Sequence, residues 1–500
     1  MQLHRRALLG GLALLPAAPA LAQPKFTPPP ILTVPVTAAE VPKPVSRRGS
    51  VLIGGKRIDY LATAQEWPVA DRSGRLGATV FSTSYVAEAG GARRPVTFLF
   101  NGGPAAPTTG LRKSLGPVGP VNAPAGVATK TGAVFVDNPH SILDASDLVF
   151  IDCVGTGYSR VLAGADGHQF WGAQEDAAAL GAFIAGWLEA NHRTASPLFL
   201  GGESYGGLRA VMIASLLAER TPRPVLFDGV ILISPLTEFR AWAPADDVQS
   251  HLDTLPSFAA VAAFHGRGAN VGKSVEAITA EANAFAGGDY ARFLAAGAAA
   301  PADDLHRIAA RYAELTGLPE AFVTQHRAKV GIPDFYNTLL ADKGERTGLL
   351  DARTHAPRAI TDKQQPPYND PSVDRYNQAF NTDDAWDEHY REMGYASPTS
   401  YQGLDMTAWS AWDKTPPKGV TNAPELMGRT LSAHPDMRLF EMGGVYDLTL
   451  PYRIAERKYA ALDLPAGRLR SKLYPTGHAI HSDPATQPVA NQDLREFMAA

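Results

Sequence analysis

The sequence has 500 residues, of which 45% are hydrophobic, and a formal net charge of −4. A chain of this length can bury a large core and exceeds one compact layer, so an insertion or a second lobe is expected. The near balance of charge gives no support for nucleic acid or an anionic membrane surface as a partner.

The first residues have the pattern of an export signal. Arg5 and Arg6 precede the apolar run 7–15, and a small-residue cleavage site follows at 20–22, which predicts a signal peptide over residues 1–22. The paired arginines favour twin-arginine export, which carries folded cargo, and an ordinary secretory signal with incidental arginines is the alternative. Pro16 interrupts the short apolar stretch, which argues against a retained membrane anchor.

Cys153 is the only cysteine of the sequence, so no intramolecular disulfide can form. A large secreted eukaryotic enzyme usually has several disulfides. We therefore interpret the chain as a bacterial exported protein, either periplasmic or secreted. Cys153 follows an apolar strand and is expected to be a small core residue, and the alternative is an oxidisable thiol near an active site.

The next part of the chain predicts a sheet of buried strands. A Pro-rich linker over 23–48 precedes two edge strands, near 57–61 and 78–82. Short, nearly continuous apolar runs follow, and strands of this kind are covered on both faces, as in a parallel sheet flanked by helices. A helical pattern at 180–188 between two of them gives the strand, helix, strand order of an α/β fold. The apolar runs are 96–100, 148–151, 198–200 and 230–233, and later strands are expected at 438–442 and 469–474.

The stretch from 237 to 432 has a different character. Long helical patterns such as 305–315 alternate with loops that contain Trp, Tyr and Pro. An insertion of this size between sheet strands usually covers the active site and shapes its pocket. We therefore expect a core formed by 49–236 and 433–500, and a largely helical cap over 237–432.

Ser204 is the predicted nucleophile. It stands in Gly202-Glu203-Ser204-Tyr205-Gly206, a G-x-S-x-G pattern directly after an apolar strand. The glycines permit a sharp strand-to-helix turn that lifts the hydroxyl out of the sheet. Because a serine hydroxyl is a poor nucleophile until a base takes its proton, the pattern predicts an acid and then a histidine further along the chain.

Asp447 and His478 are the predicted acid and base. Each follows a strand, which is where an α/β sheet presents catalytic groups. Asp447 would hold the tautomer of the histidine and stabilise the imidazolium. Asp152 competes for the acid's role, but it precedes Ser204, against the expected order, and is expected to cap a loop. His481 is the rival of His478, and its simpler interpretation is a lone surface histidine.

The loop Asn101-Gly102-Gly103-Pro104 is predicted to form an oxyanion hole. It follows the first apolar run and lies upstream of Ser204. One donor would be the N–H of Gly103, and the other the N–H of Tyr205, the residue after the nucleophile. Gly-Gly-Pro by itself is an ordinary turn, and its position relative to the G-x-S-x-G segment makes it specific. These residues imply no metal and no organic cofactor.

Together these segments resemble the serine carboxypeptidase family of α/β-hydrolases, and in particular its bacterial members. The similarity runs from about Gly54 to the C-terminus and also includes 150–159, 170–172 and 348–353. It implies an α/β-hydrolase fold with a mostly parallel central sheet, and removal of C-terminal residues from peptides through an acyl-enzyme. The implied partners are peptides with a free C-terminus, and a homodimer is compatible with it, since family members include dimers.

The resemblance also implies a site for the substrate's C-terminal carboxylate. In the family's carboxypeptidases this carboxylate is held by the Asn of the Asn-Gly-Gly-Pro loop and by the Glu before the nucleophile. In this sequence these residues are Asn101 and Glu203, and Gly102, which follows Asn101, is expected to belong to the same substrate-binding site. A glutamic acid can donate a hydrogen bond to a carboxylate only when protonated, and burial beside another acid raises its pKa. The simpler alternatives are a turn-stabilising amide for Asn101 and a solvated charge for Glu203.

The chain departs from the family pattern near this loop. Residues 104–109 read Pro-Ala-Ala-Pro-Thr-Thr, where the family usually has Pro-Gly followed by Cys or Ser. The second acid that partners the Glu in many members would fall near Ser114, and no acid lies between Asn101 and Asp137. Without that partner, Glu203 is expected to stay ionised to lower pH. Cys153 also replaces a usual proline.

Three functions follow from these patterns. The leading hypothesis is an exported serine carboxypeptidase. The second is an esterase or acyltransferase on the same triad, which the altered loop and the missing acid favour and which related plant proteins exemplify. The third is a non-catalytic peptide-binding protein on a hydrolase fold, against which a complete triad in the right order argues.

Overall fold

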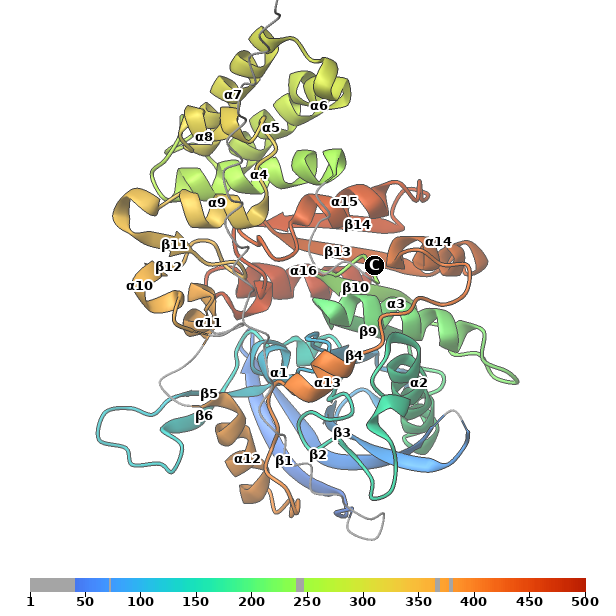
Figure 1. The fold of residues 1–500 in the computed structure, drawn as a ribbon. Coiled ribbons are helices and arrows are strands. Elements are labelled where there is room, and N and C mark those ends of the chain that lie inside the picture. Colours follow the sequence, from blue (N-terminus) through green and yellow to red (C-terminus); the bar gives the residue numbers. More distant parts are fainter. Residues whose placement is uncertain (1–40, 72, 240–246, 365–368, 377–380) are drawn as a thin grey trace, which may run out of the picture.

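The computed structural model describes residues 41–500 except 72, 240–246, 365–368 and 377–380 (Figure 1). The predicted signal peptide and most of the linker lie outside the described residues. The first strand, β1 (Val45–Ile53), begins inside the stretch expected as a linker. Of the helices described, none is long and apolar enough to cross a membrane.

A ten-stranded sheet runs through the centre of the described molecule, in the order β1-β2-β3-β7-β4-β9-β10-β13-β14, with β8 paired to β3. The strands from β7 to β14 along this order are mutually parallel, whereas β1, β2 and β3 are antiparallel. The strands are β2 (Lys56–Ala70), β3 (Leu76–Ala87), β4 (Val96–Phe100), β7 (Asp147–Ile151), β8 (Arg160–Val161), β9 (Leu198–Glu203), β10 (Gly229–Ile233), β13 (Arg438–Gly444) and β14 (Leu469–Tyr474).

Helices cover both faces of the sheet, and its central strands β4, β7, β9 and β10 are buried at every residue. Neighbouring residues of β4 illustrate this: Phe98 packs into one hydrophobic cluster and Leu99 into the other. The first cluster includes residues of α2 (Ala173–Ala190), α3 (Tyr205–Ala218), α14 (Ala423–Ala433) and α15 (Tyr452–Ala460). The second includes residues of α1 (Thr109–Leu115), α12 (Thr382–Glu392) and α16 (Gln487–Ala499). Figure 1 shows α2 and α3 together on one side of the sheet.

The chain between β10 and β13 falls into two parts. The first is a helical lobe with its own hydrophobic cluster, which joins the core through Val445, Tyr446 and Tyr452 (Figure 1). The second part returns over the core: α12 contacts the hairpin formed by β5 (Val118–Asn122) and β6 (Ala133–Asp137), and α14 packs on α3. The stretch expected as one cap therefore covers the core at two separate places. The lobe contains α4 (Val248–Phe264), α5 (Val275–Phe285), the π-helical turn Ala286–Tyr290, α6 (Ala291–Ala296), α7 (Ala302–Thr316), α8 (Glu320–Gln325), α9 (Ile332–Thr338), β11 (Glu345–Thr347) and β12 (His355–Pro357).

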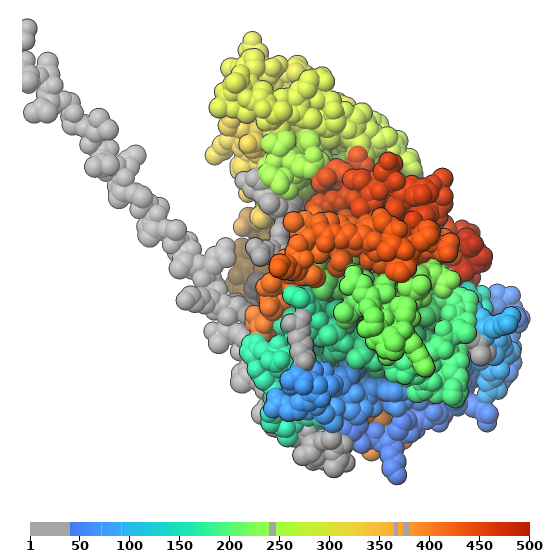
Figure 2. Space-filling model, turned by 90° about the vertical axis from the view of Figure 1, so that its right-hand side faces the viewer, coloured from blue at the N-terminus to red at the C-terminus, as the bar shows by residue number. Residues whose placement is uncertain are grey.

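The other described elements are short. They are β5 (Val118–Asn122), β6 (Ala133–Asp137), α10 (Arg358–Thr361), α11 (Pro371–Tyr376), α13 (Met406–Ala411) and the 3-10 turns 91–93, 142–144, 167–169, 297–299, 341–343 and 480–482. Figure 2 shows the lobe standing above the rest of the molecule, with the C-terminal elements between the lobe and the N-terminal strands.

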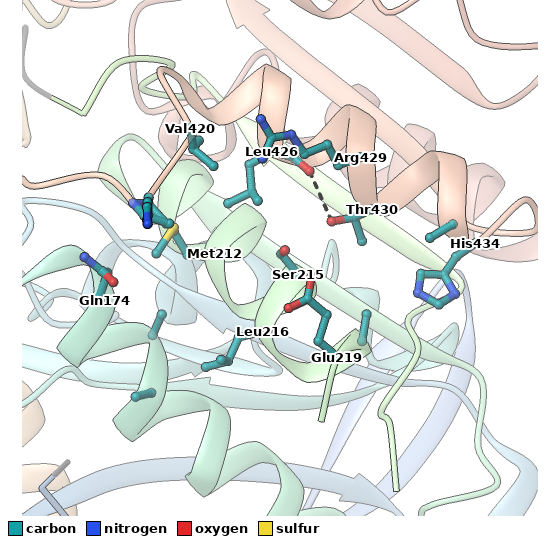
Figure 3. A pocket seen from close by; sticks show the side chains of 16 residues that line it. Gln174, Met212, Ser215, Leu216, Glu219, Val420, Leu426, Arg429, Thr430 and His434 are labelled. Atoms are coloured by element: carbon teal, nitrogen blue, oxygen red, sulfur yellow. Dashed lines mark hydrogen bonds between the residues drawn. The ribbon is translucent and has the colours of Figure 1, made fainter. Parts of the chain in front are cut away.

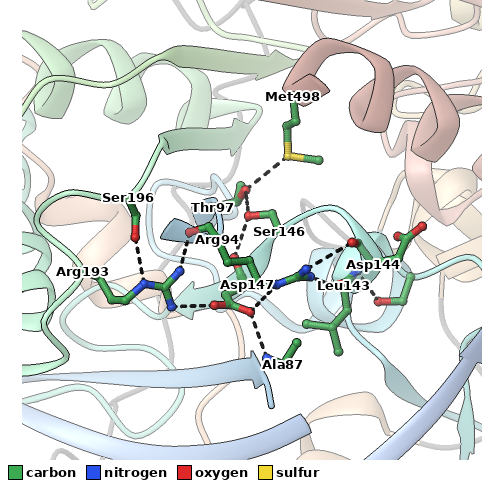
Figure 4. Close-up of polar contacts among 11 residues, drawn as sticks. Ala87, Arg94, Thr97, Leu143, Asp144, Ser146, Asp147, Arg193, Ser196 and Met498 are labelled. Carbon is green, nitrogen blue, oxygen red and sulfur yellow. Dashed lines mark hydrogen bonds and ion pairs between the residues drawn. The ribbon is translucent and has the colours of Figure 1, made fainter. Parts of the chain in front are cut away.

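Buried ion pairs close the edge of the sheet where the parallel strands begin (Figure 4). Asp147, the first residue of β7, accepts from Arg193 Nη1 over 2.6 Å and from Arg94 Nε over 2.8 Å. Arg193, which follows α2, also donates to the carbonyl of Arg94 and to Ser196. Because each buried charge has its partners, the cluster holds β4, β7 and the end of α2 together. The catalytic residues predicted above lie at the opposite edge.

Candidate active site

Ser204 lies in a strained turn between β9 and α3. Its φ is 62° and its ψ is −125°, a main-chain conformation that residues other than glycine rarely adopt. The turn is so tight that a Cβ added to Gly202 would lie 1.9 Å from the carbonyl oxygen of Gly206. The sequence pattern therefore folds into the sharp strand-to-helix turn that it predicts, and the serine side chain is at the carboxyl end of a central strand.

Main-chain hydrogen bonds hold this turn against the neighbouring strand. The Ser204 N–H donates to the carbonyl of Ile233 over 2.9 Å. Its carbonyl accepts from the N–H groups of Gly207 and Leu236, each over 3.0 Å. The turn is thus fixed by the end of β10, and the strain at Ser204 is offset by these bonds.

Asp447 and His478 form a buried pair. The Nδ1 atom of His478 lies 2.6 Å from Oδ2 of Asp447. The other carboxylate oxygen accepts from the N–H groups of Thr449 and Leu450, each over 2.9 Å. Because a carboxylate only accepts hydrogen bonds, Nδ1 carries the proton and Nε2 is left as a proton acceptor.

The electrostatic surroundings favour a protonated His478 more than solvent does. Burial lowers its pKa, but the charge of Asp447, the hydrogen bond between them and the charge of Glu203 outweigh burial, so that the pKa lies above its ordinary value. An imidazole that readily accepts a proton while Asp447 stabilises the imidazolium is what general base catalysis requires.

The loops that carry the serine and the histidine meet at the same edge of the sheet. Ser234, the residue after β10, donates from its hydroxyl to the carbonyl of His478 over 2.8 Å, while Ile233 and Leu236 bond the main chain of Ser204. From the side of the lobe, the carbonyl of Leu350 accepts from the N–H of His478 over 2.7 Å. The structure therefore brings these segments together across four neighbouring strands.

The two rival residues have other roles. Asp152 accepts from the N–H and the hydroxyl of Thr108, over 2.7 and 2.6 Å, and so caps the loop before α1. His481 is buried, not on the surface as its simpler interpretation had it, and its Nδ1 lies 2.7 Å from Asn491 Oδ1. Burial lowers its pKa to about 4. Asp447 thus pairs with His478, and His481 packs against α16.

The two predicted oxyanion donors are aimed by the carbonyls of their own peptide groups. In a trans peptide the N–H and the C=O point in opposite directions. The carbonyl of Gly102, in the peptide group that contains the Gly103 N–H, accepts a hydrogen bond from the N–H of Ala106 over 3.1 Å. The carbonyl of Ser204, in the peptide group that contains the Tyr205 N–H, accepts the two hydrogen bonds described above. The segments are in close approach, since a Cβ on Gly102 would lie 2.6 Å from the Tyr205 nitrogen. Both N–H groups are therefore directed away from their bonded carbonyls, as an oxyanion site requires.

Asn101 and Glu203 form a hydrogen-bonded pair beside the nucleophile. The Nδ2 of Asn101 donates to Oε1 of Glu203 over 2.8 Å. Burial is the largest influence on Glu203, and the charge of Asp447 adds to it, while His478 and Asn101 oppose them; the net effect raises the pKa of Glu203 to about 7. Glu203 is thus a buried acid and not a solvated charge, and it is half protonated near neutral pH.

This pKa corrects one expectation from the sequence. Glu203 was expected to stay ionised to lower pH because no second acid stands near Ser114. The structure differs from that expectation, because burial, together with the charge of Asp447, raises the pKa of Glu203 without an acid near Ser114. Ser114 itself lies on α1, where its hydroxyl is 3.3 Å from that of Ser482.

Arg209 and Trp409 also belong to this site, and the sequence analysis missed both. Arg209 on α3 donates to the carbonyls of Asn101 and Pro104 over 2.5 and 2.8 Å. Trp409 on α13 donates from Nε1 to the carbonyl of Gly103 over 2.9 Å. Arg209 is the one charged residue of the helix Tyr205–Ala218, a signal that could have been noticed. Nothing local in the sequence connects Trp409 with Gly103.

Cys153 is a core residue. Its side chain is buried, its Sγ lies 3.4 Å from the carbonyl of Pro104, and burial raises the pKa of the thiol to about 12. A thiol with so high a pKa is not a reactive one. Within the described part of the chain no cluster of three or more His, Cys, Asp or Glu residues could hold a metal ion.

A cavity of about 460 Å³ lies away from these residues, between α2, α3 and α14 (Figure 3). Its walls combine apolar side chains, such as Met212 and Leu426, with polar ones, such as Arg429 and Glu219. The residues of the predicted site do not line it. The cavity is therefore separate from the chemistry at Ser204.

Residues 73–260 match a family model described as serine carboxypeptidase. No curated protein matches the sequence. Among solved structures, the fold is similar to that of Kex1(Δ)p, a prohormone-processing carboxypeptidase from Saccharomyces cerevisiae, with a TM-score of 0.54, 11% sequence identity and 92% of each chain covered. This likeness confirms the α/β-hydrolase fold expected from the sequence.

Two further structures match with lower scores. A proline iminopeptidase from Mycobacterium smegmatis has a TM-score of 0.35 and 15% identity, with 87% of this chain and 99% of that chain covered. A thermostable carboxyl esterase from Bacillus coagulans has a TM-score of 0.37 and 12% identity, with 87% and 98% covered.

Proposed function

We propose, from the premise that this chain is a hydrolase of the serine carboxypeptidase family, that it removes the C-terminal residue of peptides through an acyl-enzyme on Ser204. The observation that carries the proposal is the Asn101–Glu203 hydrogen bond of 2.8 Å directly before the nucleophile. A protonated Glu203 and the amide of Asn101 are two donors suited to a free carboxylate. That pair favours a peptide's C-terminus over an internal peptide bond.

The proposed reaction begins with the attack of Ser204 on the last peptide bond. Its Oγ bonds to the carbonyl carbon while its proton passes to Nε2 of His478. The charge that develops on the carbonyl oxygen is met by the N–H groups of Gly103 and Tyr205. Asp447 stays ionised and stabilises the imidazolium, with the 2.6 Å bond keeping the ring in place.

The acyl-enzyme then forms and is hydrolysed. The C–N bond breaks, and His478 gives its proton to the leaving amine, which departs as the released C-terminal residue. A water molecule next gives a proton to His478, and its oxygen attacks the acyl carbon through the same oxyanion site. The ester bond to Ser204 breaks, the serine recovers its proton, and the shortened peptide leaves with a new carboxylate.

The direct test of this mechanism is covalent labelling with a fluorophosphonate. The reagent reacts with an activated serine, and peptide mass spectrometry identifies the residue. We expect the label on Ser204 in the wild type, none in Ser204→Ala, and strongly slowed labelling in His478→Ala. A label on another residue, or labelling that His478→Ala does not change, would overturn the assignment.

An esterase or acyltransferase remains the second candidate for the same serine. The observation in its favour is that Glu203 loses its proton near neutral pH and then repels a substrate carboxylate, whereas an ester without a free carboxylate is unaffected. The measurement is the ratio of kcat/KM for a blocked dipeptide acid and the matching ester. A carboxypeptidase hydrolyses the dipeptide acid at acidic pH, and an esterase hydrolyses the ester alone.

We further propose that the protein is exported from a bacterial cell. The support is the sequence of residues 1–22, with Arg5-Arg6 before an apolar run, and the single cysteine. Expression of the full chain, with and without Arg5→Lys and Arg6→Lys, tests it by fractionation. If export uses the twin-arginine route, the wild-type protein is found in the periplasm and the doubly substituted protein stays in the cytoplasm. Wild-type protein confined to the cytoplasm would contradict export.

A further inference from the structure

A buried cation lies beneath the loop predicted to bind both the oxyanion and the substrate carboxylate. The side chain of Arg209 is fully buried, and its Nε donates to Oδ2 of Asp176, on α2, over 2.6 Å. Its two remaining nitrogens donate to the carbonyls of Asn101 and Pro104. One planar guanidinium therefore joins two helices and both ends of the loop, a geometry suited to the fork of arginine donors.

Every carbonyl of the loop from residue 101 to 104 accepts a hydrogen bond. Those of Asn101 and Pro104 accept from Arg209. The carbonyl of Gly102 accepts from Ala106 N–H, and that of Gly103 accepts from Trp409 Nε1 over 2.9 Å. Because the N–H of Gly103 shares a peptide plane with the carbonyl of Gly102, fixing these carbonyls fixes the direction of the donor. Arg209 is the side chain that holds both the first and the last of the four, and the Pro104 carbonyl also lies 3.4 Å from the weakly donating Sγ of Cys153.

Aromatic rings lie next to the guanidinium of Arg209. Its central carbon lies 5.3 Å from the ring centre of Tyr205 and 5.9 Å from that of Trp412. The indole Nε1 of Trp412 donates to the Tyr205 hydroxyl over 2.8 Å. Arg209 thus contacts the residue whose N–H is the second oxyanion donor, as well as the loop that carries the first.

We propose that Arg209 is a positioning residue, which holds the loop 101–104 so that the Gly103 N–H and the Asn101 side chain keep their aim. The expected effect on kcat rests on the proposed function, whereas the expected effect on the position of the loop rests on the contacts above. Displacement of a catalytic group by about 1 Å can lower a rate about 100-fold. The expected signature is therefore a fall in kcat that exceeds what lost stability explains.

The test compares Arg209→Lys with Arg193→Lys. Both arginines are buried. Arg209 joins a carboxylate to two main-chain carbonyls, and Arg193 joins a carboxylate to one main-chain carbonyl and a serine hydroxyl at the other edge of the sheet (Figure 4). Lysine keeps the charge and cannot reach three acceptors in one plane. We expect both variants to lose stability. We expect kcat to fall about 100-fold in Arg209→Lys and less than about threefold in Arg193→Lys.

Hydrogen exchange supplies a readout that does not depend on turnover. The peptide spanning 101–107 contains the N–H of Ala106, which bonds Gly102. We expect faster exchange of this peptide in Arg209→Lys and no change in Arg193→Lys. Unchanged exchange in Arg209→Lys, or equal kcat losses in the two variants, would overturn the inference. An inactive wild type would instead refute the proposed function, and exchange would still decide the role of Arg209.

The double variant Arg209→Lys/Asp176→Glu keeps the test decisive if the single variant is too unstable. The longer glutamate meets the shorter lysine, so the ion pair is restored while the bonds to the Asn101 and Pro104 carbonyls stay lost. We expect the stability to recover and kcat to stay low. Recovery of kcat together with stability would assign Arg209 a purely structural role.

Discussion

Asn101 donates a hydrogen bond to Oε1 of Glu203 over 2.8 Å, and the peptide bond after Glu203 leads directly to Ser204. The amide of Asn101 donates to Oε1, which leaves Oε2 of Glu203 to hold a proton. On the proposed function, a protonated carboxyl in that place donates a hydrogen bond to the substrate's C-terminal carboxylate. The protonation of Glu203 is therefore expected to determine how the hydrolysis of a peptide acid depends on pH.

The proposal predicts different pH profiles for a peptide acid and for an ester. The pKa of Glu203 is raised to about 7, so its protonated form disappears as pH rises through 7. We expect kcat/KM for a blocked dipeptide acid to fall about tenfold per pH unit above 7, and no such fall for the matching ester. For both substrates the rate should rise from low pH as His478 loses its proton.

Replacement of Glu203 by Gln should remove the alkaline fall. The amide of glutamine is a permanent donor and does not titrate in this range. In Glu203→Gln, kcat/KM for the dipeptide acid should stay level above pH 7, while that for the ester should match the wild type. A variant whose profile still falls above pH 7 would show that another group titrates there.

The same substitution should change the stability of the protein at alkaline pH. A raised pKa means that the folded state holds the Glu203 proton more tightly than the unfolded state does, so stability is lost as pH rises between 4.5 and about 7. The shift is equivalent to about 3 kcal/mol. Glu203→Gln should therefore gain up to about 3 kcal/mol in unfolding free energy at pH 8, relative to its difference from wild type at pH 4. Urea denaturation at both pH values measures this, and a difference independent of pH would contradict it.

The sequence patterns predicted most of the core and little of what supports the site. The runs around Phe98 and Ile231 predict buried strands because nearly every position is apolar, and the turn at Ser204 follows from its flanking glycines. By contrast, the protonation of Glu203 depends on burial by distant segments. The bond from Trp409 to Gly103 depends on how the chain after the helical lobe returns over the core, which no local pattern encodes.

The pairing of Asp447 with His478, and not with His481, gives a further prediction. Asparagine at 447 would let Nδ1 become the acceptor and leave the proton on Nε2, the wrong tautomer for a base. We expect Asp447→Asn to lower kcat about 10³- to 10⁴-fold with little change in folding. His481→Gln, which alters the buried contact with Asn491, should lower stability and leave kcat within about threefold of the wild type. A larger loss of kcat in His481→Gln than in Asp447→Asn would indicate that His481 and not His478 is the base.

The tight turn predicts a steric intolerance at Gly202. A Cβ there would lie 1.9 Å from the carbonyl of Gly206, so Gly202→Ala must displace the main chain around Ser204. We expect a loss of at least about 2 kcal/mol in unfolding free energy, with activity lost as well. Gly287→Ala is the matched control, because no atom lies within 4 Å of its added Cβ. Thermal unfolding should show a large loss of stability for Gly202→Ala and no loss for Gly287→Ala.

The most direct measurement follows release of the last residue from two blocked dipeptides, one with a free C-terminal carboxylate and one with an amide. The protein from residue 23 onward would be assayed from acidic to neutral pH, with Ser204→Ala as the control. The account predicts release from the free acid, no comparable release from the amide, and no release by Ser204→Ala. Equal cleavage of both dipeptides, or of neither, would contradict the carboxypeptidase assignment.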